Sequence, residues 1–197
     1  MQAFHRRRTL PTVRKSDGFT LIEMLVVMGI VIIMVTAGVP ALQQMVSRNR
    51  MTAQLNEFVG VIHTARSEAI KNNTTVSVCR AHASTANTCD TSGSWANGWY
   101  VFLNLDDDTA IDAGEEIVVS GTPSDGFTFK SALATKDMTF RPSGRATEMN
   151  APTTGITGDL TFCQGARVAG EITLDLTGRP QAQKFTSDTD IAAAGCP

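Results

Sequence analysis

The densest group of side chains that could do chemistry is a run of carboxylates in the middle of the chain. Carboxylate oxygens are the ligands that Ca²⁺ prefers in proteins. The spacing departs from that of an EF-hand loop, because the pattern Asp-x-Asp-x-Asp-Gly is absent, and the run stands between two expected strands. We therefore interpret it as the solvated tip of a hairpin rather than as a metal site. Its members are Asp106, Asp107, Asp108, Asp112, Glu115 and Glu116.

The sequence lacks the common catalytic and metal-binding patterns. It has no Gly-x-Ser-x-Gly elbow, no His-Glu-x-x-His pair, no phosphate loop and no dinucleotide fingerprint. A zinc site is disfavoured, because no Cys-x-x-Cys occurs and His63 and His82 have no ligand-like spacing. We expect no enzymatic activity, no bound metal and no cofactor.

Four cysteines allow three disulfide pairings, and the sequence alone does not choose among them. We favour the sequential pairs Cys79 with Cys89 and Cys163 with Cys196. Cys79 leaves an expected strand into a polar loop that returns at Cys89, and Cys196 could hold the end of the chain against a strand. Such bonds require an oxidising compartment outside the cytoplasm.

An uncharged apolar stretch dominates the N-terminal quarter of the chain. No residue between Met24 and Ser47 is charged, and a helix of this length, rising about 1.5 Å per residue, spans the roughly 30 Å hydrocarbon layer. Residues 1–18 carry a local charge of +4, and the remainder carries −6. Because positive charge marks the cytoplasmic side, we expect the N-terminus in the cytoplasm and the acidic body after residue 50 outside it.

Glu23 places a carboxylate near the start of this apolar stretch. An unpaired charge there costs about 2–3 kcal/mol, so it needs a partner. An ordinary signal peptide cut near Ala37 or Gly38 and a plain single-pass anchor remain as alternatives, but neither accounts for the carboxylate. Cleavage between Gly18 and Phe19 would create an α-ammonium group that could pair with Glu23 in the same chain or in a neighbour.

The residues around this position resemble a known signal. Lys15-Ser-Asp-Gly18, followed by Phe19-Thr-Leu-Ile-Glu23 and the apolar run, is similar to the class III signal of type IV prepilins and type II secretion pseudopilins. The resemblance implies that a prepilin peptidase cuts after Gly18 and N-methylates Phe19. Glu23 then becomes the fifth residue, where this class has a glutamate, and Pro40 becomes the twenty-second, where these helices commonly have a proline.

Beyond Pro40 the apolar pattern becomes one-sided, which predicts that the helix continues to about Ile70 and ends at Asn72-Asn73. Pro40 removes a helical hydrogen bond and Gly38 weakens the same turn, so we expect a kink or a locally melted stretch there. The apolar positions are spaced three and four residues apart. They are Met51, Leu55, Phe58, Ile62, Ala65 and Ala69.

From Thr74 onward, short β-favouring runs alternate with turn signals. No parallel βα repeat is visible, so we expect a compact antiparallel sandwich, or two small sheets packed on the helix. The aromatic residues Trp95, Trp99, Tyr100 and Phe102 are interpreted as core rather than as a binding platform. The expected strands are residues 75–79, 98–103, 116–119, 127–129, 138–140, 159–163, 171–176 and 181–185.

The order of several segments in the second half resembles the GspH/FimT family of minor pilins and pseudopilins. The segments are Trp95–Asn104, the acidic stretch to Glu116-Ile-Val-Val, Phe140–Arg145, Leu160–Cys163 and Ile172–Arg179. The resemblance implies an α+β, pilin-like fold, with a long N-terminal helix packed on an antiparallel β-sandwich. The expected layout is a leader over 1–18, a membrane and assembly helix over 19–47, an amphipathic continuation over 48–72 and a periplasmic β-rich domain over 73–197.

Two glycine–arginine pairs, Gly144-Arg145 and Gly178-Arg179, raise the question of DNA binding. Some FimT-type pilins bind DNA through a C-terminal Gly-Arg-x-Arg turn, but this chain reads Gly178-Arg179-Pro180-Gln181 and lacks the second arginine. Residues 164–197 carry a net charge of −1, which argues against strong nonspecific binding. Arg179 and Lys184 remain the candidate DNA contacts, and we favour a structural role for both turns.

The sequence thus predicts a structural subunit of a type IV pilus or a type II secretion pseudopilus, in filament initiation or the tip complex. The expected partners are the prepilin peptidase, other pilins or pseudopilins through the helix, and the bacterial inner membrane before assembly. A DNA-binding minor pilin for natural transformation is the first alternative, and an exported adhesin or sensor on an ordinary anchor is the second. The sequence does not distinguish a pilus from a secretion system.

Overall fold

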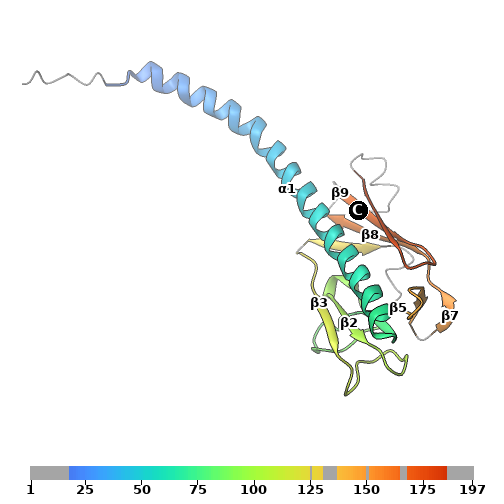
Figure 1. The fold of residues 1–197 in the computed structure, drawn as a ribbon. Coiled ribbons are helices and arrows are strands. Elements are labelled where there is room, and N and C mark those ends of the chain that lie inside the picture. The colour runs from blue at the N-terminus through green and yellow to red at the C-terminus, as the bar shows by residue number, and fades with distance from the viewer. Residues whose placement is uncertain (1–17, 125, 131–136, 150, 165–167, 186–197) are drawn as a thin grey trace, which may run out of the picture. The chain divides into compact units, whose positions relative to one another are not determined.

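The computed structural model describes residues 18–124, 126–130, 137–149, 151–164 and 168–185. The first described element is a long helix, α1 (Leu21–Asn72), and the remaining described elements are strands and one short 3-10 helix, η1 (Trp95–Asn97) (Figure 1). The chain divides into two compact units, residues 1–43 and residues 44–197, and the boundary between them lies inside α1. Each unit is described by itself below.

The part of α1 in the first unit is apolar and its side chains are exposed. Among the described residues, α1 is the one helix whose length and composition would allow it to cross a membrane. The helix is continuous through Gly38 and Pro40, so the expected melting does not occur. A proline removes a single backbone hydrogen bond, and the residues on both sides keep theirs.

The second unit contains two antiparallel sheets. One has six strands in the order β3-β2-β1-β5-β6-β7, and the other has four in the order β10-β9-β8-β4. This outcome matches the expected alternative of two sheets, and the eight expected strands lie close to observed ones. The strands are β1 (Val76–Arg80), β2 (Trp99–Leu103), β3 (Ile117–Gly121), β4 (Phe127–Lys130), β5 (Met138–Phe140), β6 (Ala146–Glu148), β7 (Ala151–Gly155), β8 (Gly158–Gln164), β9 (Val168–Leu174) and β10 (Pro180–Phe185).

The core of this unit lies between the second part of α1 and the sheets. All six apolar helix positions expected to face the body are buried. Phe58 is central, because its ring makes edge-on contacts with those of Trp95, Trp99 and Phe162 at centroid distances of 5.2–5.7 Å. Trp95, Trp99 and Phe102 are buried as expected, whereas the half-buried Tyr100 accepts a hydrogen bond from the Asn87 N–H through its hydroxyl.

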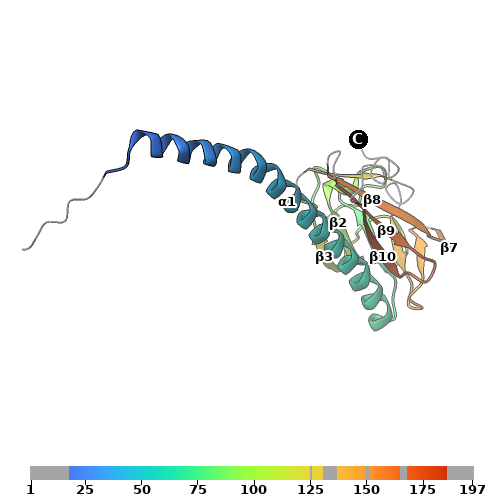
Figure 2. The ribbon, with the colours of Figure 1, turned by 90° about the horizontal axis from the view of Figure 1, so that it is seen from above.

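The four-stranded sheet approaches α1 closely at Gly170 in β9. A Cβ at this position would stand 2.6 Å from Cδ1 of Leu55 and 3.1 Å from the sulfur of Met51. A larger residue at this position would have to displace the ends of the Leu55 and Met51 side chains. Figure 2 shows β8, β9 and β10 together beside this part of α1.

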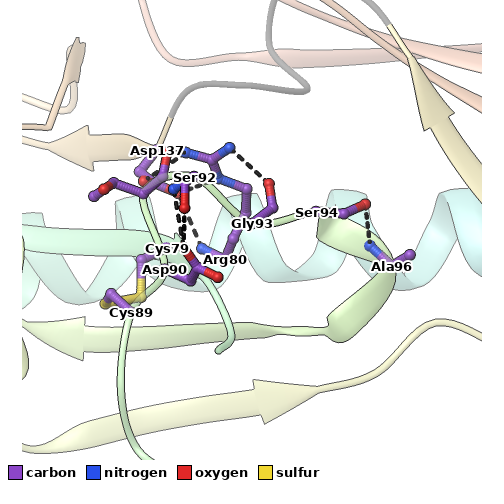
Figure 3. Close-up of polar contacts among 10 residues, drawn as sticks. Cys79, Arg80, Cys89, Asp90, Ser92, Gly93, Ser94, Ala96 and Asp137 are labelled. Atoms are coloured by element: carbon purple, nitrogen blue, oxygen red, sulfur yellow. Dashed lines mark hydrogen bonds and ion pairs between the residues drawn. A yellow bond between two sulfur atoms is a disulfide. The ribbon is translucent and has the colours of Figure 1, made fainter. Parts of the chain in front are cut away.

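A buried ion pair fixes the centre of the six-stranded sheet (Figure 3). Arg80 at the end of β1 donates through Nε to Oδ1 of Asp137, just before β5. Its other guanidinium nitrogens donate to the carbonyl oxygens of Thr91 and Gly93. One arginine thus joins two strands to the loop that leads into η1.

Candidate functional site

The predicted cleavage position lies at the first described residues of the chain. Gly18 and Phe19 are both exposed and precede the helix, which begins at Leu21. An exposed segment outside the helix is accessible to a peptidase. Cleavage between Gly18 and Phe19 and methylation of Phe19 stay predictions.

Glu23 has a partner that the sequence analysis missed. The backbone N–H of Thr20 donates to Oε2 of Glu23 at 3.3 Å, and the backbone N–H of Glu23 donates to Oγ1 of Thr20 at 3.3 Å. This reciprocal arrangement is a capping box, which satisfies two backbone donors at the start of a helix. The signal was present as Thr20-Leu-Ile-Glu23, a Thr-x-x-Glu pattern before an apolar run. Glu23 is therefore held by hydrogen bonds in the uncut chain, and its charge pairing with the α-ammonium group of Phe19 stays a prediction.

The apolar side chains that follow Glu23 are available for contact. From Leu21 to Val35 every large apolar side chain of the first unit is exposed, among the residues described. Such a surface is stable only in lipid or against other apolar helices. Pro40 lies within α1 in the same unit, and its role in assembly is untested.

A disulfide joins Cys79 in β1 to Cys89, which is one of the two predicted pairs. The disulfide closes the polar loop between these residues. An isolated β-bridge between Ala81 and Cys89 also holds this loop against the sheet. Cys163 is buried in β8, and its predicted partner Cys196 lies outside the described residues.

The acidic run forms the loop between β2 and β3, as the hairpin interpretation predicted. Carboxylate oxygens of Asp106, Asp108 and Asp112 come within 4.8 Å of one another. Glu115 holds the loop together, because its Oε1 accepts from the N–H of Leu105 and its Oε2 from that of Asp112. Clustered exposed carboxylates alone do not make a cation site, so we assign none.

The two glycine–arginine turns, 34 residues apart in sequence, come together in space. Gly144 and Gly178 both have positive φ, +77° and +74°. A Cβ on Gly178 would stand 2.6 Å from the carbonyl oxygen of Gly144, and that oxygen accepts a hydrogen bond from Nε of Arg66 at 3.0 Å. The following residues, Arg145 and Arg179, are exposed.

The two candidate DNA contacts, by comparison, occupy different places. Arg179 follows the turn at Gly178, whereas Lys184 lies near the far end of β10. The Nζ of Lys184 donates to Oγ1 of Thr52, fourteen residues before Arg66 along α1. Since a helix rises about 1.5 Å per residue, roughly 20 Å of helix separates the two sites.

The carboxylate of Asp175 organises the second turn. It accepts from the hydroxyl and the N–H of Thr177 and from the N–H of Arg179. Hydrogen bonding by Thr177 first, and then by the Arg179 backbone, lowers the pKa of Asp175. The turn is thus fixed by an ionised carboxylate at neutral pH.

Comparison with known families identifies the class of protein. The family described as type II transport protein GspH matches residues 54–178, which is more than half of the chain. This chain belongs to the GspH family. The prokaryotic N-terminal methylation motif separately matches residues 13–39, which include Gly18, Phe19 and Glu23.

One solved structure agrees with this GspH-family assignment at the level of the fold, and a second is reported as a weaker similarity. The type IV minor pilin FimU of Pseudomonas aeruginosa is 18% identical over 73% of this chain and 92% of its own, with a TM-score of 0.50. The minor pseudopilin EpsH of the Vibrio cholerae type 2 secretion system is 10% identical over 70% and 97%, with a TM-score of 0.44. Among curated proteins, no sequence matches the chain. The GspH-family chain thus has the expected pilin-like fold, with a long N-terminal helix packed on antiparallel sheets.

Proposed function

We propose that this GspH-family protein is a minor pilin or pseudopilin that acts in filament initiation or in the tip complex. The observation that carries the proposal is the methylation motif over residues 13–39, joined in one chain to the GspH-family match over residues 54–178. The first region supplies the processing signal and the second supplies the domain. Neither an ordinary signal peptide nor a plain anchor requires that combination.

The first step is retention in the inner membrane. The basic residues before Gly18 stay in the cytoplasm, the apolar part of α1 crosses the bilayer, and the β-domain lies in the periplasm. The Cys79–Cys89 disulfide supports an oxidising location for the domain. Prepilin peptidase then removes residues 1–18 and methylates Phe19.

The second step is transfer from lipid into a bundle of similar helices. The exposed apolar side chains of α1 exchange lipid contacts for contacts with neighbouring subunits. The new α-ammonium group of Phe19 adds a charge partner for Glu23, which the capping box already holds at the helix start. A single polar residue in an apolar helix interface selects one register over others.

Mass spectrometry of the mature N-terminus tests the proposal. The protein purified from its host membranes is expected to begin with N-methylated Phe19. A chain that keeps residues 1–18, or one that begins after the apolar stretch, would contradict it. Changing Gly18 to a bulkier residue is expected to leave the chain uncut and membrane-bound.

DNA binding remains the second candidate function. The observation in its favour is that Gly178 abuts the carbonyl oxygen of Gly144 and that each glycine is followed by an exposed arginine, Arg179 and Arg145. Salt-sensitive retardation of duplex DNA by the full chain, lost on changing both arginines to alanine, would support it. Unretarded DNA at low salt would exclude it, because phosphate contacts are strongest there.

A further inference from the structure

The paired turns form a rigid platform at the end of the domain where α1 ends. Gly178 abuts the carbonyl oxygen of Gly144, and Arg66 on α1 donates to the same oxygen. The helix and two separate hairpin connections therefore hold one another in place. Side chains that project from this platform are presented with little freedom of the backbone beneath them.

The two turns and the adjoining end of α1 carry exposed cations and exposed apolar side chains, and the Leu176 side chain lies beside Gly155 of β7. The guanidinium groups of Arg145 and Arg179 have no ion-pair partner within 4.0 Å among the described residues. Ile70, whose Cδ1 lies beside Gly144, is 50% exposed, and Leu176 in the second turn is 47% exposed. We call Arg66, Ile70, Arg145, Leu176 and Arg179 the turn-pair surface.

The apolar side chains of the turn-pair surface are unusual for this domain. Among the described residues after Val46, the only other large apolar side chain that is exposed is Leu105, at 64%. Leu105 belongs to the same end, because the N–H of the preceding Asn104 donates to the carbonyl oxygen of Thr75, just beyond α1. Arginine combined with apolar side chains is the composition typical of protein interfaces.

The neighbouring charges favour a compact protein partner over a nucleic acid. The acidic loop between β2 and β3 adjoins the first turn, because Asp107 forms an ion pair with Arg141 at 2.6 Å. A duplex extends its phosphates well beyond two arginines and would meet these carboxylates, which repel it. A protein surface can place carboxylates opposite Arg145 and Arg179 alone and cover Ile70 and Leu176 with apolar side chains.

We propose that the turn-pair surface docks an acidic, partly apolar patch on a neighbouring subunit of the filament. This inference rests on the proposed function, because that function supplies subunits as neighbours. It adds the location of one interface and the chemistry of the partner. The contact is made by the folded domain and is separate from the packing of the apolar helices.

Photochemical cross-linking of the full chain in its host membranes tests the proposal. A photoreactive benzoylphenylalanine in place of Leu176 is expected to form an adduct with one protein that carries a prepilin-type N-terminus. Mass spectrometry of the adduct is expected to place the cross-link beside Asp or Glu residues flanked by apolar ones. The matched control carries the same amino acid in place of the exposed Gln183 on β10, which lies away from the surface.

Charge reversal decides whether the arginines make the contact. R145E/R179E is expected to lower the adduct yield about tenfold, equivalent to about 1.4 kcal/mol, and reversal of the mapped carboxylates to lysine is expected to restore it. K184E, which also reverses an exposed cation, is expected to leave the yield unchanged. A thermal unfolding midpoint of R145E/R179E equal to that of the wild type shows that the domain is folded.

Several results would overturn the docking surface. They are the absence of an adduct, equal yields from both positions, a nuclease-sensitive adduct, a partner without a prepilin-type N-terminus, and a yield that charge reversal does not change. The N-terminal mass of the same sample is read separately. If the mature chain begins at methylated Phe19 but forms no adduct, only the docking proposal is contradicted. If the chain is uncut, the proposed function is contradicted.

Discussion

The guanidinium of Arg80 binds both carboxylate oxygens of Asp137, with Nε 3.0 Å from Oδ1 and the NH2 nitrogen 3.1 Å from Oδ2. The two side chains are only 2% and 4% exposed. Asp137 Oδ1 also accepts from the backbone N–H of Arg80, so the pair joins β1 and the start of β5 through three hydrogen bonds. Burial makes each charge depend on the other, because neither can be solvated by water.

Replacing Asp137 with alanine is therefore expected to destabilise the protein by about 3–5 kcal/mol, since the buried guanidinium of Arg80 loses its ion pair with this carboxylate. Urea unfolding in detergent, followed by the fluorescence of Trp95 and Trp99, measures the change. E68A is the control, because it breaks the exposed pair with Lys71 and should cost only about 0–1 kcal/mol. Equal costs for D137A and E68A would contradict a structural role for the buried pair.

The contact between the two glycine turns predicts a large effect of a single methyl group. G178A adds a Cβ that meets the carbonyl oxygen of Gly144, and it also forces alanine into a φ of +74°. G114A has a φ of +103° and nothing within 4 Å of the added Cβ, so it isolates the backbone cost of about 1–3 kcal/mol. G178A is expected to be the more destabilising change in thermal unfolding. A smaller cost for G178A than for G114A would show that the turns do not abut.

Glu171 predicts a specific dependence of stability on pH. Burial first, and then the charge and hydrogen bonding of Asp159, raise the pKa of Glu171 above its usual 4.5. Between the pKa of Glu171 in the unfolded state and its higher pKa in the folded state, only the folded state keeps the proton. The free energy of unfolding therefore falls as the pH rises through the folded-state pKa. E171Q cannot titrate and is expected to lose less stability than the wild type between about pH 4 and pH 8.

Unfolding midpoints of the wild type and of E171Q, measured across that pH range, check the predicted direction of the stability change. The comparison of the two proteins is essential because Asp90 and Asp175 act in the opposite direction. Hydrogen bonding lowers the pKa of each, so their contributions are lost as the pH falls. Parallel curves for wild type and E171Q would contradict the prediction.

Substitutions at Glu23 and Thr20 separate helix capping from charge pairing. E23Q can keep the capping box but loses the charge, whereas T20A keeps the charge and loses the box, which costs about 0.5–2 kcal/mol. If Glu23 pairs with the Phe19 amine, E23Q and E23A are both expected to remain in the membrane, and T20A to enter filaments at a reduced level. The fraction of protein in sheared filaments measures this, and wild-type incorporation of E23Q would contradict the pairing.

The sequence predicted the elements with strong local patterns. The amphipathic spacing of α1 identified the buried face, and short β-favouring runs between turn signals located eight strands. It missed β6 and β7, whose segments Ala-Thr-Glu and Ala-Pro-Thr-Thr-Gly have low strand propensity. Pro152 is tolerated because β7 is an edge strand, where a missing N–H need not break a ladder.

Contacts between residues that are far apart in the chain could not be predicted from a single sequence. Arg80 and Asp137 are 57 residues apart, and no local pattern marks either as buried. The contact between the turns at Gly144 and Gly178 likewise depends on how the two sheets pack against each other. The capping box at Thr20 and Glu23, in contrast, is a local pattern and could have been predicted.

The absence of a side chain at Gly170 also bears on how the molecule responds to mechanical load. Leu55 occupies the space that a Cβ would fill, so an axial slip of α1 would press it against a bulkier residue of β9. In the proposed filament subunit, this contact would carry force on the helix directly into the four-stranded sheet.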